Sequence, residues 1–324
     1  HNADGELLHA EKSADSAPNT PIDGENWSLD AAGNWLSHSR GSSAVMETRT
    51  HNSMNRLTAI GGGGQTVVEG TVNEFARVTV NGAAAQLSKD SGGDGFRYRR
   101  TVPVQAGTNT VTVQATDTGG ATTTKQWQFS VPAATRSFTH DTNGNTLTDG
   151  QRTMTWDVKN RLRTVTKGTT TWKWDYDHAD RRVKEYQYPV GSSSGAAFTT
   201  PTKIFIWSST NVVQERNASN TITRTHYSGG FSDGAAPTTG TKYQLLTDHL
   251  GHVREIVDAN GTIVTRYDYT SYQGPVKVSG TLEATFQTIG RYYHHAGSGL
   301  ELALYRAYDA ELGRWLSEDP IGER

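Results

Sequence analysis

Two aspartates near the end of the sequence, Asp309 and Asp319, have the type and spacing that could support catalysis. Two carboxylates held close together share one proton, so one can activate water while the other polarises a carbonyl group. Arg306 and Arg314 lie beside them and could hold that geometry through bidentate contacts. The ten-residue spacing suits two strands joined by a turn at residues 311–313, which would fold one carboxylate towards the other. In the alternative interpretation, the aspartates cap turns and the arginines bridge strands.

Histidines supply the other candidate constellation. His249 and His252 form a His-x-x-His pair, and His294 and His295 are adjacent. On a helix such a pair could begin a metal site, but Gly251 lies inside it and the sequence context is a hairpin turn. We therefore interpret these residues as surface or strand-pairing histidines, and we predict no metal and no cofactor.

The composition excludes several other kinds of site. Without cysteine, the chain has no disulfide, no thiol nucleophile and no Cys-ligated zinc. No P-loop, dinucleotide-binding fingerprint or Gly-x-Ser-x-Gly elbow occurs. A net charge of −2 offers no electrostatic reason for a nucleic-acid partner, and no apolar run is long enough to span a membrane. Because the chain starts at His1 in mid-pattern, we expect it to be a fragment of a longer protein.

A short unit recurs along the chain: an aromatic residue, an aspartate shortly after it, then Gly, Asn or Arg, then Leu or Val. Asp and Asn form turns and Gly or Asn accepts a positive φ, while alternating flanks such as Thr164-Val165-Thr166 are typical of strands. Each hairpin is too small to bury its own apolar face, so we predict that successive hairpins stack edge to edge into one long sheet. An ordinary β-sandwich with chance likeness between its turns is the alternative. Copies of the unit lie at residues 27–34, 138–147, 156–162 and 174–183.

These units resemble YD repeats, and towards the C-terminus the match becomes specific and resembles the RHS-associated core. The resemblance is loose over residues 1–65, moderate over 135–242 and close over 243–322. It implies an all-β fold, a wound β-sheet shell of YD/RHS hairpin repeats. The best helix candidate is a short piece between Tyr305 and Leu316. The motifs that match the core lie at residues 248–254, 258–261, 267–269, 272–275, 290–293 and 304–322.

Residues 66–132 do not fit the repeat. They contain at least six short alternating strands with turn residues between them, which is the spacing of a β-sandwich. They resemble a bacterial immunoglobulin-like domain inserted into the array. Polar stretches at residues 11–25 and 191–201 are interpreted as surface loops. The predicted domains are a YD-repeat segment (1–65), the inserted immunoglobulin-like β-sandwich (66–134), a second YD-repeat segment (135–242) and the RHS-associated core (243–324).

The resemblance implies a structural function. The chain would be a shell segment of a bacterial protein that is secreted or carried on the cell surface, and the shell would enclose or present a C-terminal toxin or effector beyond this chain. A second hypothesis is binding, in which the immunoglobulin-like domain or an aromatic face recognises a cell-surface protein or glycan. Repeat aromatics more often fill a core, and we predict that Trp156, Trp174 and Tyr269 point into one aromatic layer.

The third hypothesis is enzymatic. The resemblance implies self-cleavage just downstream of the core by an aspartyl-protease-like pair of carboxylates, here the two aspartates named above, acting once on its own chain. The sequence departs from the family pattern in two places. Ala310 follows Asp309 where the family has proline, and Glu323-Arg324 stands where a leucine typically follows. We therefore expect no cleavage within residues 1–324.

Overall fold

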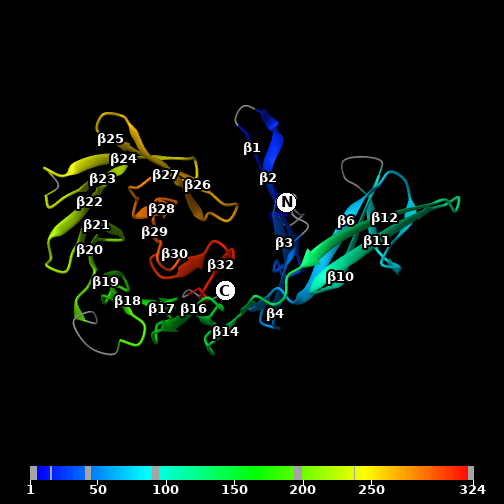
Figure 1. Cartoon of the computed structure of the whole chain (residues 1–324), viewed down its shortest axis with the longest axis horizontal. Helices are drawn as coiled ribbons and strands as arrows, with labels where there is room; N and C mark the ends of the chain where they lie inside the picture. Colours follow the sequence, from blue (N-terminus) through cyan, green and yellow to red (C-terminus); the bar gives the residue numbers. More distant parts are fainter. Residues whose placement is uncertain are drawn as a thin grey trace. The chain divides into compact units, whose positions relative to one another are not determined.

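The computed structural model describes residues 6–14, 17–40, 45–89, 95–192, 199–236 and 238–319. The chain forms two compact units, residues 1–138 and 139–324 (Figure 1). The bounded elements of the described residues are β-strands, numbered β1 to β32, which confirms the all-β prediction.

Two local predictions are wrong. The segment from Tyr305 to Leu316 contains no helix but two paired strands, β31 (Ala307–Asp309) and β32 (Arg314–Trp315). Ala307 and Asp309 are buried while the side chain between them is partly exposed, which is the alternation of a strand. In the polar stretch at residues 11–25, the described residues form no loop but belong to the paired strands β1 (His9–Ala14) and β2 (Ala17–Leu29), where pairing satisfies the backbone. In the other predicted loop, residues 193–198 lie outside the described residues.

The first unit contains a six-stranded antiparallel sheet in the order β1-β2-β3-β4-β5-β13. Strand β13 pairs with β5 although all the strands numbered between them belong to other sheets. At this point the Thr135 N–H donates to the Ile60 carbonyl at 2.9 Å. The intervening segment therefore leaves the repeat sheet and returns to it at one place. The remaining strands of this sheet are β3 (Trp35–Arg40), β4 (Glu47–His51), β5 (Leu57–Ile60) and β13 (Arg136–Ser137).

The intervening segment forms two smaller sheets, ordered β6-β10-β9 and β12-β11-β7-β8. Their valines meet in one apolar cluster, in which Val80 from one sheet and Val102 from the other are almost fully buried. The segment thus has a hydrophobic core of its own. Its strands are β6 (Gly63–Val72), β7 (Ala76–Val80), β8 (Ala83–Ala84), β9 (Gln86–Lys89), β10 (Phe96–Gln105), β11 (Gly107–Asp117) and β12 (Thr122–Val131).

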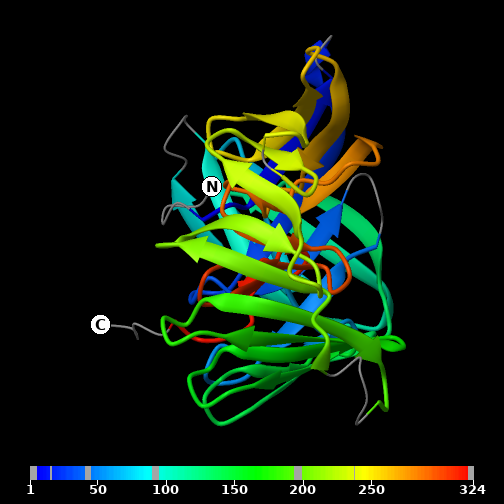
Figure 2. The same ribbon diagram turned by 90° about the vertical axis from the view of Figure 1, so that its left-hand side faces the viewer.

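The second unit is built on a single antiparallel sheet of fourteen strands, β14 to β27, paired in sequence order. We call it the wound sheet, because it curves in a wide arc in Figure 1 and its rungs lie one above the other in Figure 2. The strands are β14 (Thr139–His140), β15 (Thr146–Thr148), β16 (Arg152–Trp156), β17 (Leu162–Lys167), β18 (Thr170–Tyr176), β19 (Arg182–Pro189), β20 (Lys203–Ser208), β21 (Asn211–Arg216), β22 (Ile222–Tyr227), β23 (Gly230–Asp233), β24 (Thr241–Thr247), β25 (Val253–Asp258), β26 (Ile263–Tyr269) and β27 (Pro275–Gly280).

A five-stranded sheet, β28 to β32, lies inside this arc (Figure 1). We call residues 284–319, which contain it, the C-terminal core. Three of its leucines, Leu300, Leu302 and Leu312, are almost fully buried. Its first three strands are β28 (Phe286–Thr288), β29 (Tyr292–His295) and β30 (Leu300–Leu302).

One turn recurs through both units. In the copy at Asp157, the carboxylate Oδ1 accepts the N–H groups of Lys159 at 2.9 Å and Arg161 at 3.0 Å. Asn160 adopts φ 58°, the left-handed region that Asn tolerates. The strand register shifts beside this turn, as in a hairpin closed by a bulge. The same pair of bonds occurs in turns that begin at Asp30, Asn52, Asp141, Asp177, Asn217, Asp248 and Asp258.

The aromatic residue directly before a turn binds the preceding rung. Trp156 Nε1–H donates to the Thr146 carbonyl, and the Tyr176 hydroxyl to the Leu162 carbonyl, both at 2.8 Å. The hydroxyl of Tyr269 donates to the Val253 carbonyl, also at 2.8 Å. In each case the carbonyl belongs to the residue that follows an earlier turn of this kind, which begins at Asp141, Asp157 or Asp248, so the aromatic satisfies a carbonyl next to the bulge.

The predicted aromatic layer needs correction, because its three members are not equivalent. Trp156 and Tyr269 occupy the position before a turn, but in the repeat at residues 174–183 Tyr176 holds that position. Trp174 instead lies two residues further back, fully buried, with its indole against the ring of His295 at 5.2 Å. Trp174 therefore belongs to the contact between the wound sheet and the C-terminal core.

Candidate functional site in the C-terminal core

Asp309 ends β31 in the interior of the second unit, with 1% of its surface exposed. Its Oδ1 accepts the N–H groups of Glu311 at 2.9 Å and Leu312 at 3.1 Å, so it caps the turn that leads into β32. Its Oδ2 accepts the Arg152 guanidinium, which belongs to the wound sheet. The carboxylate thus joins a local turn to a strand far away in the sequence.

Arg152 lies between two buried carboxylates. Besides Asp309, it binds Oδ2 of Asp149 at 2.6 Å through Nε, and it donates to the Ser298 carbonyl at 3.0 Å. Burial alone would raise the pKa of Asp149, but the charge of Arg152 and hydrogen bonds from the backbone hold it below its ordinary value. Burial would conversely lower the pKa of Arg152, and the two carboxylates raise it. The triad of Asp149, Arg152 and Asp309 fixes the C-terminal core to the wound sheet.

Asp319 lies in a different environment. Its carboxylate pairs with the Arg306 guanidinium at 3.0 Å, and 39% of its side chain is exposed. Arg306 in turn lies over the ring of Trp315, 4.1 Å from its centroid. Arg314 stands opposite Asp309 in the antiparallel pairing of β31 with β32. The structure therefore joins the four predicted site residues as two pairs, Asp319 with Arg306 by an ion pair and Asp309 with Arg314 by strand register.

Arg152 and Asp149 are not recognisable as site residues from the sequence. Asp149 lies in the connection before β16 and Arg152 is the first residue of that strand, where no aromatic-Asp unit marks them. Their partner Asp309 is 157 residues from Arg152 along the chain. The one local signal is the short Asp149-Gly150-Gln151-Arg152 turn, in which the aspartate caps the N–H of the arginine at 2.7 Å.

Glu185 forms a second buried contact between the wound sheet and the core. Its Oε2 accepts the Trp174 indole N–H and the Tyr293 hydroxyl, each at 3.0 Å. His295 lies beside it, with Nε2 3.8 Å from the same oxygen. Burial lowers the pKa of His295 to about 4, against the opposing charge of Glu185. Burial likewise raises the pKa of Tyr293 well above its ordinary value, with Glu185 adding to the effect.

Glu215 forms a third contact. It binds His226 at 2.8 Å and Lys203 at 2.9 Å, and it accepts the hydroxyl of Thr285 from the core. Burial would raise the pKa of the Glu215 carboxyl, but the His226 hydrogen bond and the Lys203 charge hold it well below its ordinary value. An unpaired carboxylate at this depth would cost several kcal/mol, on the order of 3–5, so its partners are structurally essential.

Backbone groups of the core are bound in the same way. Arg182 of β19 donates to the carbonyls of Leu302 at 2.8 Å and Ala303 at 2.6 Å. The Thr146 N–H donates to the Leu316 carbonyl at 2.8 Å. Every contact in this series crosses from the wound sheet to the core, so the core is held by polar groups as well as by its apolar side chains.

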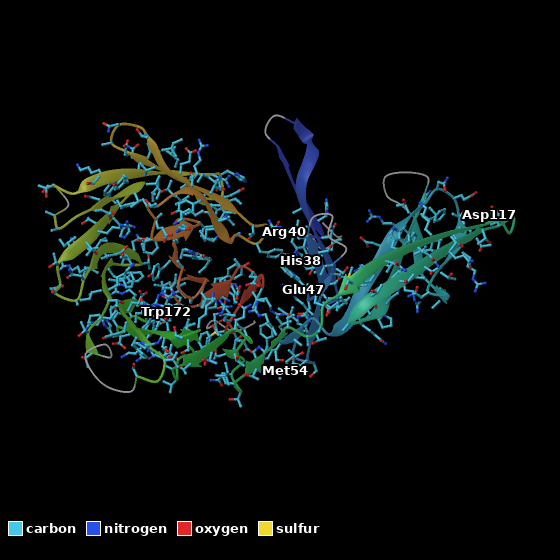
Figure 3. The ribbon with its side chains drawn as sticks, viewed as in Figure 1. His38, Arg40, Glu47, Met54, Asp117 and Trp172 are labelled. Atoms are coloured by element: carbon cyan, nitrogen blue, oxygen red, sulfur yellow. The ribbon has the colours of Figure 1, made fainter. Side chains whose placement is uncertain are left out.

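Shape complementarity accompanies these polar contacts. Gly297 lies flat against Trp172, which is labelled in Figure 3, and a Cβ at Gly297 would lie 2.5 Å from the Cζ2 atom of that ring. The Trp172 ring also contacts His295 edge-on, with centroids 5.2 Å apart. Only glycine fits at position 297 with the ring in this place.

The histidines of the sequence motif do not form a metal site in the described residues, where no group of three or more suitable side chains gathers. His252 is 3% exposed rather than a surface residue, and its Nδ1 accepts the Ile289 N–H of the core at 3.1 Å. His249 is exposed. Within the part of the chain that the structure describes, no helix is long and apolar enough to cross a membrane.

Comparison with known proteins agrees with this architecture. The chain is 28% identical over 234 residues to the tRNA3(Ser)-specific nuclease WapA of Bacillus spizizenii, a match that covers 70% of this chain and 9% of that protein. It is 23% identical over 218 residues to the double-stranded DNA deaminase toxin A of Burkholderia cenocepacia, covering 57% of this chain and 15% of that protein. The chain thus spans less than a fifth of the length of either relative.

Among solved structures, a crystal structure of TcdB2-TccC3-TEV matches 98% of this chain and 16% of its own chain, with 14% identity and a TM-score of 0.43. A Tc holotoxin pore of Photorhabdus luminescens also matches 98% of this chain and 16% of its own chain, with 15% identity and a TM-score of 0.44. The Teneurin YD-shell family model matches residues 105–322, more than half of the sequence. With its repeated Asp turns and its wound sheet, the chain belongs to the Teneurin YD-shell family.

Proposed function

We propose that this structural shell segment encloses or presents a C-terminal effector that lies beyond the chain. The observation that carries the proposal is the row of buried polar contacts from Arg152, Arg182, Glu185 and Glu215 to the C-terminal core. These contacts hold the chain on the inner side of the wound sheet as far as Leu316, so a segment that follows would start from this side. Two relatives bear the names of a nuclease and a deaminase toxin, which supports a toxic effector.

Limited proteolysis of the chain with its natural continuation tests this proposal. A continuation that is enclosed should resist a protease that cleaves the same continuation when it is expressed by itself. Equal cleavage rates in the two forms would contradict enclosure, and a continuation that is cleaved but stays bound to the shell would indicate presentation instead.

A second candidate function is intramolecular cleavage by Asp309 and Asp319. It is supported by the placement of Asp309 on the same hairpin as Arg314, with Arg306 and Asp319 as the residues that flank this hairpin. In this arrangement each aspartate has an arginine partner, and an aspartyl pair must share one proton. Catalysis would therefore require Arg306 to release the more exposed Asp319 when the downstream chain is bound.

We also propose that residues 66–134 are an inserted immunoglobulin-like domain and that the protein is secreted or carried on the bacterial cell surface. The separate apolar core of this segment supports an insertion, and so does the hydrogen bond from Thr135 to Ile60, which brings the entry and the exit of the segment together. Its partner would be a cell-surface protein or glycan. A glycan screen on the whole chain, with binding lost when Trp127 is replaced, would support this role; Trp127 is 47% exposed on β12. Unchanged binding in that variant would contradict it.

A further inference from the structure

Two buried histidines between the wound sheet and the C-terminal core accept hydrogen bonds from backbone N–H groups. Nδ1 of His252 accepts the N–H of Ile289 at 3.1 Å, and Nδ1 of His295 accepts the N–H of Ser298 at 3.2 Å. A backbone N–H can only donate, so Nδ1 of each ring carries no proton and the ring is neutral. A second proton on either ring would occupy Nδ1 and remove the hydrogen bond from the backbone N–H. At His295 the Ser298 hydroxyl also lies 2.8 Å from Nδ1 and would change from donor to acceptor, so the bond that protonation breaks there is the one from the Ser298 N–H.

The His252 contact holds a strained piece of backbone. Ile289 is β-branched, yet it adopts φ 46°, a region that such residues rarely occupy. Gly251 lies close to Ile289, since a Cβ at position 251 would be 3.6 Å from the Ile289 backbone. The His252 ring is stacked on Tyr269 with centroids 4.6 Å apart. The charged and titratable groups that face this ring are Asp248, Arg254, His249 and Glu301.

The His295 ring is enclosed by aromatic side chains from both sheets. Trp172 and Trp174 of the wound sheet meet it edge-on, each at 5.2 Å, and Tyr293 of the core lies at 5.7 Å. Glu185 is the neighbouring anion, but its oxygen is 3.8 Å from Nε2. The charged and titratable groups that face this ring are Glu185, Lys203, His294 and Arg182.

Two other histidines at the same interface differ in one respect. His226 binds Glu215 at 2.8 Å, and His294 binds Glu301. Their partners are carboxylates, so a protonated ring keeps its hydrogen bond and gains an ion pair. Protonation therefore breaks the backbone hydrogen bonds that His252 and His295 accept, whereas the bonds of His226 and His294 to carboxylates are compatible with a protonated ring.

We propose that His252 and His295 form an acid-sensitive latch, which holds the C-terminal core at neutral pH and releases Ile289 and Ser298 when either ring is protonated. Burial lowers the pKa of both histidines in the closed state, to about 4 for His295. A histidine released to water has a pKa of about 6.5. The stabilisation is thus complete above about pH 6.5 and is lost as the pH falls. For an effector, the consequence would be release in an acidic compartment, and that step rests on the shell function proposed above.

Hydrogen exchange of the Ile289 and Ser298 amides in the whole chain measures the latch directly. After correction for intrinsic exchange, opening at Ser298 should be about 30-fold more frequent at pH 5 than at pH 7.5, given pKa values of about 4 and about 6.5. In His295→Asn, the amide oxygen can take the place of Nδ1 but does not titrate, so the increase should disappear. His252→Asn should do the same at Ile289. The exposed His249→Asn is the matched control and should keep both increases.

An unchanged opening frequency from pH 7.5 to 5 in the unmodified chain would overturn the latch, as would an increase that persists in the Asn variants. Should those variants fail to fold, an NMR titration of the unmodified chain decides, because His295 that titrates near pH 6.5 in the closed state contradicts the proposal. The same exchange measurement on a chain with its natural continuation separates the two proposals. Acid opening without exposure of the continuation to protease would contradict effector release alone. A continuation that is cleaved at pH 7.5 as fast as when it is expressed by itself would contradict enclosure alone, and absence of acid opening would contradict the latch alone.

Discussion

Arg152 of the wound sheet binds Asp309 of the C-terminal core, and both side chains are buried, 4% and 1% exposed. Because Arg152 also binds the fully buried Asp149, one cation serves two anions in the interior. The arrangement explains how the short hairpin of β31 and β32 is held in a single position against the wound sheet.

Removing this cation should be costly. Arg152→Met keeps much of the side-chain volume but leaves two carboxylates buried without their partner, so the free energy of unfolding should fall by about 3–5 kcal/mol. Urea denaturation measures it. Lys159→Met is the control, since Lys159 is 54% exposed in its pair with Asp180 and should lose less than about 1 kcal/mol. Similar losses of unfolding free energy in the two variants would mean that the buried triad contributes no more to stability than an exposed ion pair.

A methyl group at Gly297 should weaken the packing of the C-terminal core against the wound sheet and lower the stability of the protein. In Gly297→Ala the new Cβ would overlap Trp172, whose ring is confined by His295. Overpacking of this kind costs about 1–3 kcal/mol, measurable by thermal or urea denaturation. Adding Trp172→Phe removes the overlapping atom, so the double variant should lose less than the sum of the two single changes. Additive losses would place the damage elsewhere.

The left-handed residue of a turn also binds the turn before it. Asn160 Oδ1 accepts Nδ2–H groups of Asn143 at 3.0 Å and Asn145 at 2.8 Å. Asn160→Gly would relieve the backbone at φ 58° but would remove both bonds, each worth about 0.5–1.5 kcal/mol. We expect a net loss of about 1–2 kcal/mol. Asn220→Gly, at φ 61° with one exposed contact from Arg216, should be nearly neutral. An increase in stability in Asn160→Gly would show that the backbone strain at this position costs more free energy than the two side-chain hydrogen bonds supply.

Acid should destabilise the second unit below about pH 4 through Glu215 and Asp149. Their pKa values are held below the ordinary range in the folded state, so their contribution is complete above the unfolded values of about 4 and is lost as the pH falls through the folded values. Glu215→Gln should be less stable than the unmodified chain at pH 7, and the difference should shrink by pH 3. A difference that is constant with pH would assign the effect to packing rather than charge.

Cleavage can be tested by intact mass on a chain with its natural continuation. If the aspartates form a catalytic pair, Asp309→Asn and Asp319→Asn should each abolish cleavage while the circular dichroism spectrum stays unchanged. The chain of residues 1–324 should remain whole. Normal processing of the Asp309→Asn protein would reduce this residue to a turn cap bound to Arg152. Samples must be kept near neutral pH, because Asp319-Pro320 is an acid-labile bond.

The sequence alone determined the repeating part of this protein. An aspartate such as Asp157 bonds to the N–H groups two and four residues later, so the whole turn is encoded within five positions and can be recognised from spacing. The same local chemistry predicted the edge-to-edge stacking, since each hairpin leaves an apolar face uncovered. The ten-residue spacing of Asp309 and Asp319 also predicts a turn at residues 311–313 between two strands, but the segment from Tyr305 to Leu316 is equally the best helix candidate, and it is the structure that pairs Asp309 with Arg314.

Only the tertiary structure decided what the core contacts. In the sequence, Glu185 and Glu215 look like ordinary polar positions of alternating strands. No residue near Arg152 in the sequence indicates that Asp309 is its partner. Which side chains meet the core depends on the curvature accumulated over the fourteen strands of the wound sheet, and each strand adds a small twist set by its own bulges. Local hydrogen bonds can therefore be predicted from the sequence. The contact between Arg152 and Asp309, which are 157 residues apart, forms only when every intervening strand is in place.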